Sequence, residues 1–468
     1  MKMGKEKKAA VDGPIYDARS LGTPKMLILG VQHLFAMFGS TVLVPILTGL
    51  SVSATLLFAG LATMFMHLVT KRKVPVFLGS SFAFLGGYCA IIAAGGELGL
   101  SQREALPYAC VGVACAGLLY LVLAGICKAF GSKNVMRFFP PVVTGPIIIA
   151  IGLILAPSAI NSCSSNWWIA LIAIVVVIVC NIWGKGMIKI IPILMGVLAS
   201  YLVAAITGNV DFSGVKDAAW IGLPVAMQNT VFGLFSGEVN TGLLVSSIIM
   251  IVPIAFATMM EHVGDISAIG GTIEKNLIED PGLHRTLIGD GVGTTIAALF
   301  GAPANTTYGE NTGVLVLTKV YDPKVVRLAA LYAIVLSFCP KFAALISAMP
   351  AATIGGVSII LYGMISAVGV RNMVENHTDF QKSRNVIVAA VILGLALGIN
   401  FSGLLGADIT TAGNNATGAI SFMIGDMKIA LSGLAVASIV GIILNAILPG
   451  KRDEYMPNEK NSGSLGKF

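Results

Sequence analysis

Glu310 is a carboxylate within an otherwise apolar stretch, GAPANTTYGENTGVLVLTK (residues 301–319). A charge at bilayer depth is costly unless it is paired, hydrated or neutralised, so such a group normally faces a cavity and marks a pathway. Glu310 and Asn311 would also lie at the start of the helical run that follows, where the helix dipole favours an anion or a carbonyl oxygen. The alternative is a helix-capping acid at a water interface.

A second polar cluster, Glu261, His262 and Asp265, lies in MMEHVGDISAIGG (259–271). Glu261 and Asp265 are four residues apart and share one helical face, whereas His262 points about 100° away. Two carboxylates on one face of an apolar span repel each other and lose hydration, which makes them candidate proton carriers. For Asp265 the alternative is a position at the headgroup level, with Glu261 alone embedded.

Four further side chains stand out in apolar surroundings. Gln32 and His33 are the strongly polar residues of an early apolar run, and a single membrane His is more often an interhelical hydrogen-bond partner than a ligand. Phe82 and Phe84 alternate along the chain, so one of them would face a cavity if the backbone there is extended. Packing in the core is the more ordinary role for either ring.

The sequence lacks the residue patterns of a soluble enzyme. It contains no nucleotide-binding glycine loop with its lysine, no serine elbow and no His/Cys metal set. Its 7 cysteines are scattered without metal-ligand spacing and are typical of small packing residues. We therefore expect no catalytic residues, no metal site and no cofactor. The polar, basic first residues predict no cleaved signal peptide.

The composition indicates an integral membrane protein: of 468 residues 56% are hydrophobic and 11% charged, and the mean hydropathy is +0.87. Because a bilayer core takes about 20 apolar residues per helix, the charge-poor runs predict about 14 crossings. Those runs are 26–70 and 138–184, with room for two helices each, and 74–96, 105–127, 190–210, 239–260, 291–309, 311–318, 328–340, 342–370, 385–407 and 429–450.

The basic residues predict how the chain is oriented. An even number of crossings puts both termini on one side, and with the termini in the cytoplasm all 30 Lys and Arg are internal except Arg103, Lys216, Lys341 and Lys428. The net charge of +7 is thus explained by orientation, and nucleic acid is not an expected partner. The predicted division is a cytoplasmic tail (1–24), a first seven-span half (25–208), an extracellular connection (209–245), a second seven-span half (246–450) and a cytoplasmic tail (451–468).

Two interrupted spans occupy matching positions in the two halves. KVPVFLGSSFAFLGGY (73–88) and the stretch around Glu310 share a plan of proline, a few extended or turn residues and a short helical run. Gly79 and Gly309 are separated by nearly the same number of residues as Gln32 and Glu261. An offset of seven spans gives the halves opposite orientations, and interrupted spans at matching positions indicate a secondary transporter with its substrate site at the breaks.

These motifs resemble those of the nucleobase/ascorbate transporter family (nucleobase:cation symporter-2). ENTGVLVLTK fits its signature of an acid or amide, Asn, any residue, Gly, four residues, Thr and a basic residue or Gly. The matching residues are Glu310, Asn311, Gly313, Thr318 and Lys319. Gln32-His33, GSSFAF and EHVGD are similar to its first-, third- and eighth-span elements. A Glu at 310 resembles the uracil permease branch, whereas xanthine and urate members typically have Gln there.

The resemblance implies an all-α membrane fold of two inverted seven-span repeats, with short strands in broken spans three and ten and separate core and gate domains. It also implies that Glu261 and Glu310 hydrogen-bond the ring nitrogens of a nucleobase, that Phe82 stacks on the base, and that Tyr308 lines the pocket. Backbone at Ser81, Gly309 and Glu310 would meet the carbonyl oxygens. The supporting motif residues would be Gln32, His33, His262, Asn311, Gly313 and Thr318.

The family's proton-coupled uracil carriers often have His at the position of Asp265, so we expect proton coupling chiefly from Glu261, with Asp265 as a second candidate. The predicted function is uracil import by proton symport and alternating access in a bacterial inner membrane, among lipids, with a homodimer through the gate domain as a further expectation. A xanthine or other purine permease is the nearest alternative. An anion exchanger or channel of the sulfate-carrier type is more remote, and a membrane-embedded enzyme is more remote still.

Overall fold

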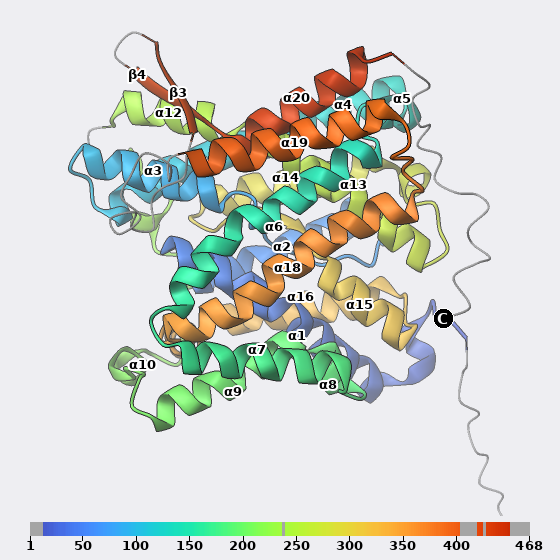
Figure 1. The fold of residues 1–468 in the computed structure, drawn as a ribbon. Helices are drawn as coiled ribbons and strands as arrows, with labels where there is room; N and C mark the ends of the chain where they lie inside the picture. Colours follow the sequence, from blue (N-terminus) through green and yellow to red (C-terminus); the bar gives the residue numbers. More distant parts are fainter. Residues whose placement is uncertain (1–12, 236–238, 403–418, 425–426, 450–468) are drawn as a thin grey trace, which may run out of the picture.

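The computed structural model describes residues 13–235, 239–402, 419–424 and 427–449, and helices dominate these residues (Figure 1). Among them, 7 helices are long and apolar enough to cross a membrane, or 8 if a bent pair is counted as one span. The long elements are α1 (Thr23–Thr48), α2 (Val52–Val69), α4 (Gln102–Phe130), α6 (Pro141–Cys163), α12 (Thr241–Ile251) continuing into α13 (Ile254–Thr272), α18 (Ala351–Glu375) and α19 (Ser383–Ser402). The prediction of an all-α membrane protein is confirmed.

Shorter or broken helices occupy the remaining apolar runs, so the count of about 14 crossings stays a prediction. The short apolar helices are α7 (Trp167–Ile182), α9 (Pro192–Ile206) and α20 (Gly433–Ile447). α16 (Pro323–Ser337) and α17 (Pro340–Ser347) form the bent pair, which turns through 90° before Pro340. The brief connecting elements are η1 (Ala18–Leu21), α5 (Ser132–Met136), α8 (Met187–Ile190), α10 (Ser213–Asp217), η2 (Met227–Asn229), α11 (Val231–Leu234) and η3 (Ile278–Gly282).

Both predicted breaks form strands. β1 (Leu78–Ser80) pairs antiparallel with β2 (Asn305–Thr307), in the register Leu78↔Thr307, Gly79↔Thr306 and Ser80↔Asn305. Each strand runs into a half-helix, α3 (Leu85–Glu97) after β1 and α15 (Gly309–Thr318) after β2. Because the strands are antiparallel, the two half-helices leave their meeting point in opposite directions, α3 to the left and α15 to the right in Figure 1. The strands expected in the third and tenth spans are therefore present.

One predicted boundary is wrong. The charge-free run 291–309 is not a single helix, since α14 spans Leu283–Leu299 and the chain is extended by β2. The reason is local: Gly301 has a φ of +77°, which few other residues adopt, and Pro303 lacks the N–H that a helix needs. The span therefore begins earlier than the run and includes Asp290. A hairpin of β3 (Ala419–Ile424) and β4 (Met427–Ser432) was also not predicted.

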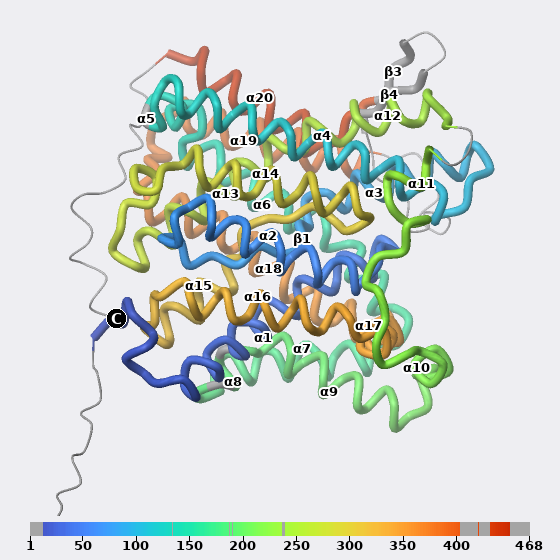
Figure 2. The backbone as a smooth tube through the Cα atoms, turned by 180° about the vertical axis from the view of Figure 1, so that it is seen from behind, coloured from blue at the N-terminus to red at the C-terminus, as the bar shows by residue number. Residues whose placement is uncertain are grey.

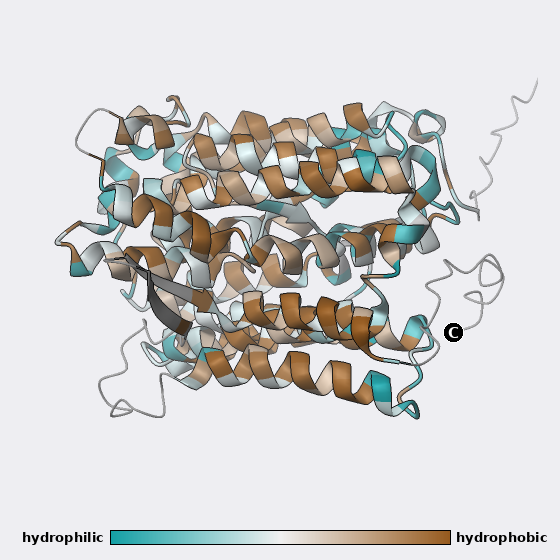
Figure 3. Cartoon of the chain, turned by 90° about the horizontal axis from the view of Figure 1, so that it is seen from above, coloured by the Kyte–Doolittle hydropathy of each residue, from teal (hydrophilic) through white to brown (hydrophobic). Residues whose placement is uncertain are grey.

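The helices form two groups that lie one behind the other. In Figure 1 α6, α18 and α19 lie in front, and in Figure 2, from the opposite side, α4, α14 and α16 do. The front group packs through α6 with α18, α7 with α9, and α19 with α20; the rear group packs through α4 with α14, α2 with α16, and α1 with α16. Apolar residues line the outer helices, while hydrophilic residues gather toward the ends (Figure 3). This is the pattern of a bundle surrounded by lipid.

Small residues allow the front helices to approach closely. A Cβ placed on Gly369 of α18 would lie 2.6 Å from the carbonyl oxygen of Gly145 in α6, and one on Gly355 would lie 2.6 Å from the backbone nitrogen of Cys163. Close backbone approach through Gly is a common way for membrane helices to associate, because lipid offers no hydrophobic driving force between them.

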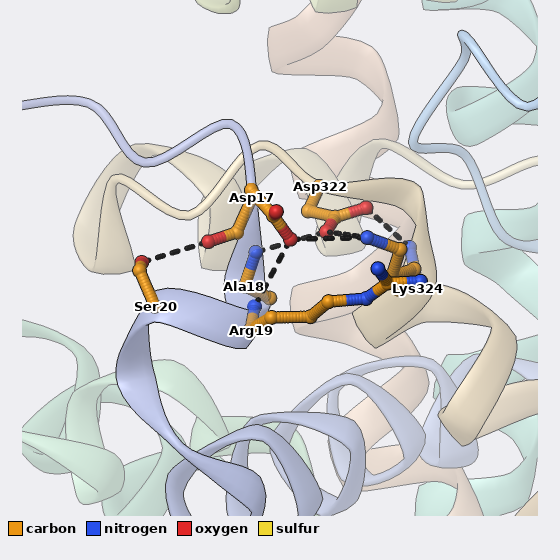
Figure 4. A network of polar contacts seen from close by, with 6 residues as sticks. All are labelled: Asp17, Ala18, Arg19, Ser20, Asp322 and Lys324. Carbon is orange, nitrogen blue, oxygen red and sulfur yellow. Dashed lines mark hydrogen bonds and ion pairs between the residues drawn. The ribbon is translucent and has the colours of Figure 1, made fainter.

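Residues 15–20, which we call the N-terminal strap, attach the start of α1 to the loop after α15 (Figure 4). Ile15 pairs with Val320, and the backbone N–H of Ala18 donates to Asp322 Oδ2 at 2.9 Å. Lys324 Nζ donates to Asp17 Oδ1 at 3.0 Å, and Tyr16 donates to the carbonyl of Ile273 just beyond α13. The strap therefore joins the ends of three elements that carry predicted site residues.

Candidate functional site

Glu310 lies in the first turn of α15, where the chain changes from strand to helix. Tyr308 before it is extended, with φ −104° and ψ 116°, and the helix begins at Gly309. The Glu310 side chain is half-buried, and its Oε1 accepts a hydrogen bond from Ser40 Oγ of α1 at 2.8 Å. A Cβ added to Gly309 would meet nothing within 4 Å, so open space lies beside the carboxylate. Glu310 is thus partly exposed and is not packed fully in the core.

The α13 carboxylates are brought to the same region. α13 packs against both β2 and α15, and Thr307 Oγ1 of β2 donates to Asp265 Oδ2 at 2.7 Å. Glu261 lies within electrostatic range of both Asp265 and Glu310. Asp265 is 9% exposed and bonded to the buried strand. The two acid clusters predicted from separate motifs therefore share one site.

The paired strands β1 and β2 lie next to these carboxylates. Tyr308 donates through its hydroxyl to the carbonyl of Ser80 at 3.0 Å, and Ser80 Oγ donates to the carbonyl of Thr41 in α1 at 2.8 Å. The Tyr308 ring lies directly over Gly79, where a Cβ would collide with it. Tyr308 is buried, so its ring supports the strand pair and its hydroxyl is already occupied.

Two predicted contacts look different in the structure. The backbone N–H of Ser81 donates to the carbonyl of Ala304 at 2.8 Å, so it is not free for a ligand; the Ser81 hydroxyl has no partner among the described residues. Phe82 is 6% exposed and its ring meets Tyr362 edge-on, with 5.6 Å between centroids. Phe84 is 1% exposed, and both rings belong to the core; the contact with Tyr362 of α18 places Phe82 next to the front group of helices.

The Gln32-His33 motif of α1 contacts the signature motif of α15. The side-chain amide of Asn311 donates to the carbonyl oxygen of His33 at 3.1 Å and lies 3.1 Å from His33 Nδ1. Gln32 is half-buried, and its Oε1 has no partner among the described residues. Thr318 bonds to the carbonyl of Val314 within α15 and lies at the end of that helix, and a Cβ on Gly313 would meet open space.

Sequence reasoning missed Asp290. This residue of α14 is 0% exposed, and its Oδ2 lies 2.9 Å from Nδ1 of His262, also 0% exposed. Asp290 directly precedes the charge-free run 291–309, so in the sequence it resembles a charged residue at the end of a membrane span. The signal that could have identified it is the surrounding GDGVGTT, whose small residues predict close helix packing on both sides of the acid. Ser40 and Thr307 were also missed, because hydroxyl residues are common in membrane helices.

No group of three or more His, Cys, Asp or Glu side chains in the described part of the chain is arranged to hold a metal ion. The arrangement instead offers half-buried carboxylates, open helix-start amides and a neighbouring ring. Such a site at the junction of two broken spans, between two groups of helices, is the architecture of a membrane transport protein. Its polar groups are suited to binding a small polar molecule.

Comparison with known proteins identifies the family. Residues 24–404 match the xanthine–uracil permease family, described as a permease family. The chain belongs to this family, which is the one its motifs resemble, and it is a permease rather than an enzyme.

Bacterial relatives match over nearly the whole chain. The uracil permease of Bacillus caldolyticus is 38% identical over 448 residues, covering 94% of this chain and 95% of that protein. The uracil permease of Bacillus subtilis (strain 168) is 37% identical over 450 residues, covering 93% and 95%. The uracil permease of Escherichia coli (strain K12) is 35% identical over 430 residues, covering 90% of each chain. The chain is therefore a multi-pass membrane protein related to bacterial permeases.

Solved structures share the fold at low identity. The transmembrane domain of the cyanobacterial bicarbonate transporter BicA superposes with a TM-score of 0.56 and 14% identity, covering 92% of this chain and 99% of that one. SLC26A9 superposes with a TM-score of 0.60 and 12% identity, covering 89% and 70%. At this identity the likeness concerns the fold alone.

Proposed function

We propose that this permease imports uracil together with a proton by alternating access. The observation that carries the proposal is that Glu261 and Glu310, from different helices, lie within electrostatic range of each other at the junction of two broken spans. Carboxylates can accept the N–H protons of a pyrimidine, and one of them can carry a proton across. The relatives named uracil permease, at 35% to 38% identity, support the choice of substrate.

In this proposal Glu261 and Glu310 bind the ring nitrogens and Phe82 stacks on the base. The open start of α15 at Gly309 and Glu310, together with Ser81, meets the carbonyl oxygens. Since the Ser81 N–H is bonded to Ala304, the Ser81 hydroxyl is the group that would reach the ligand. Glu261 is the principal proton carrier, and Asp265, held by Thr307, is the second candidate.

The proposed architecture is two inverted seven-span repeats in a bacterial inner membrane, with both termini cytoplasmic. The rear helix group, which includes the broken spans, would be the core domain, and the front group would be the gate. Movement of the core against the gate would expose the site inward. A homodimer would form through the gate domain, whose outer helices are exposed and apolar.

The test is uptake of radiolabelled uracil into proteoliposomes with an imposed inward proton gradient. Wild-type protein and Glu97→Ala, which removes an exposed glutamate of α3, should both accumulate uracil. Glu261→Ala and Glu310→Ala should both lose accumulation. Accumulation at the wild-type rate by both of these variants would overturn the proposal, and uptake that does not depend on the proton gradient would overturn its proton-coupled part.

Competition separates the alternatives. A xanthine permease would show uracil uptake blocked by excess xanthine, whereas we expect competition from uracil analogues only. An anion exchanger would carry chloride or sulfate, which favour a positive site. Glu310 in the first turn of α15 opposes anion binding at that helix start, so we expect no chloride or sulfate flux.

A further inference from the structure

A buried contact between a histidine and an aspartate involves the residue that follows the proposed proton carrier in the chain. His262 follows Glu261 in α13, and its Nδ1 lies 2.9 Å from Asp290 Oδ2 of α14, with both side chains 0% exposed. Apart from this close contact, neither ring nitrogen of His262 and neither carboxylate oxygen of Asp290 has a hydrogen-bond partner among the described residues. Nothing in the proposed transport cycle yet uses this pair. Burying two polar side chains costs their hydration, so the presence of this pair calls for an explanation.

The position of Asp290 is fixed by close packing on both sides. A Cβ on Gly291 would lie 2.5 Å from Tyr120 Cβ and 2.7 Å from the carbonyl oxygen of Gly117 in α4. A Cβ on Gly293 would lie 2.8 Å from Ala62 Cβ of α2, and one on Gly289 would collide with Met66. The α14 backbone is therefore held against α2 and α4, and Asp290 presents a carboxylate at a fixed place.

Side chains from α4 and α14 contact His262, whereas Glu261 lies on a different face of α13. The edge of the Tyr120 ring faces His262, with 6.4 Å between centroids, and Asp290 approaches from α14. Neighbouring residues on a helix differ in direction by about 100°, so holding His262 sets the rotation of α13 and with it the direction of Glu261. The same rotation sets Asp265, which bonds to Thr307.

The pair also belongs to the electrostatic surroundings of Glu261. The ionisable groups near Glu261 are Asp265 on its own helix, Asp290 on α14, Glu310 on α15, Tyr120 on α4 and Tyr308 beside β2. Asp290 also has a close side-chain partner of its own, His262. The contact between His262 and Asp290 therefore affects the electrostatic environment of Glu261.

We propose that His262 and Asp290 are a positioning pair for Glu261: Asp290 holds His262, which orients Glu261 toward the substrate, and His262 in turn occupies the Asp290 carboxylate. The pair does not touch the substrate. This inference rests on the proposed role of Glu261 in uracil binding and proton coupling. It assigns Asp290, from a third helix, to the machinery that controls the coupling carboxylate.

The experiment compares His262→Asn, Asp290→Asn and the double variant with a matched control, Asp322→Asn. Asp322 is also a buried aspartate, paired with Lys324 at 3.3 Å, but it lies at the N-terminal strap. In purified full-length protein we would measure the melting temperature and the uracil dissociation constant across pH. The double variant guards against misfolding, because two amides can pair without leaving a buried charge.

For His262→Asn we expect uracil affinity to fall by about tenfold and its pH midpoint to move by about half a unit, because an uncompensated carboxylate remains near Glu261. Asp290→Asn should also weaken uracil binding, and the double variant should recover most of the affinity. Asp322→Asn should lower the melting temperature but leave the affinity and the pH midpoint unchanged.

The inference is overturned if His262→Asn and Asp290→Asn behave like Asp322→Asn, with lower stability but wild-type affinity and pH midpoint per folded molecule. A double variant that binds no better than either single variant would also overturn it. Glu261→Gln, measured alongside, separates this result from failure of the proposed function. If Glu261→Gln binds uracil as wild type does, the role of Glu261 itself is wrong.

Discussion

The side-chain amide of Asn311 donates to the carbonyl oxygen of His33 at 3.1 Å and lies 3.1 Å from the ring nitrogen Nδ1 of the same residue. The same amide therefore contacts both the backbone and the ring of His33. Two motifs far apart in the sequence thus meet through one amide. Asn311 fixes α15, and with it Glu310, against α1.

Removing this amide should loosen the site. For Asn311→Ala we expect a loss of about 1–3 kcal/mol in the free energy of unfolding, because buried acceptors on His33 lose their donor. Uracil uptake should also fall, since Glu310 is the adjacent residue. Asn209→Ala, at an exposed loop position, serves as the control. Equal uptake and equal melting temperatures for the two variants would contradict the assignment.

The Ser40 hydroxyl should contribute directly to uracil affinity. It donates to Glu310 Oε1 at 2.8 Å, and a hydrogen bond to a charged group typically contributes about 1.5–3 kcal/mol. Ser40→Ala should therefore weaken uracil binding by about tenfold or more, measured by calorimetry. Ser438→Ala removes a buried hydroxyl whose one hydrogen bond to the described part of the chain goes to the carbonyl of Leu434 in its own helix, and we expect this variant to bind uracil normally. Identical affinities for the two variants would show that Ser40 does not act on the site.

The breaks in the two spans could be predicted because turn residues interrupt apolar sequence there. Gly79 weakens a helix and Pro303 interrupts one, and the structure places paired strands at both sites. The paired Glu261 and Glu310 could be identified because a carboxylate in an apolar span is rare. A single sequence therefore reveals turn-forming and charged residues most readily when they stand in an apolar membrane span.

Gly79 should not tolerate a side chain. A Cβ there would lie 2.8 Å from Thr41 Oγ1 and would collide with the Tyr308 ring. Gly79→Ala should therefore force the strands apart, destabilise the protein by about 1–3 kcal/mol and lower uptake. Gly86→Ala provides the matched control, since a Cβ there meets nothing within 4 Å. If Gly79→Ala transports like Gly86→Ala, close packing of the strand pair is not required.

The stability that the N-terminal strap contributes should depend on pH in a defined direction. The hydrogen bond from Lys324, followed by that from the Arg19 backbone, holds the pKa of Asp17 below its usual value of 3.8. A carboxyl group whose pKa is lower in the folded state stabilises the folded protein at pH values above its unfolded-state pKa. This contribution is lost as the pH falls through the folded-state pKa. Asp17→Asn should therefore lower the melting temperature at neutral pH, and the difference from wild type should vanish in strong acid.

Lys324→Gln tests whether this effect comes from the pair. If Asp17 and Lys324 act on each other, the double variant should melt close to either single variant. Fully additive shifts, or a difference from wild type that persists in strong acid, would assign the effect to something other than this ion pair.

The rest of the site could not be predicted because it depends on which helices meet. Asp290 is next to an apolar run and resembles a boundary charge, and only the packing of α14 against α13 shows that it faces His262. Ser40 and Thr307 are ordinary membrane residues until Glu310 and Asp265 are placed beside them. The Ser81 N–H was expected at the substrate, but the strand register gives it to Ala304.

The central claim is that Glu261 and Glu310 bind the same pyrimidine. Calorimetric titration of uracil into purified wild-type protein, Glu261→Gln and Glu310→Gln tests it most directly, since each amide keeps the shape of the side chain but loses the charged acceptor. The account predicts that each substitution weakens uracil binding by about tenfold to a hundredfold. Wild-type affinity in either variant would contradict the claim.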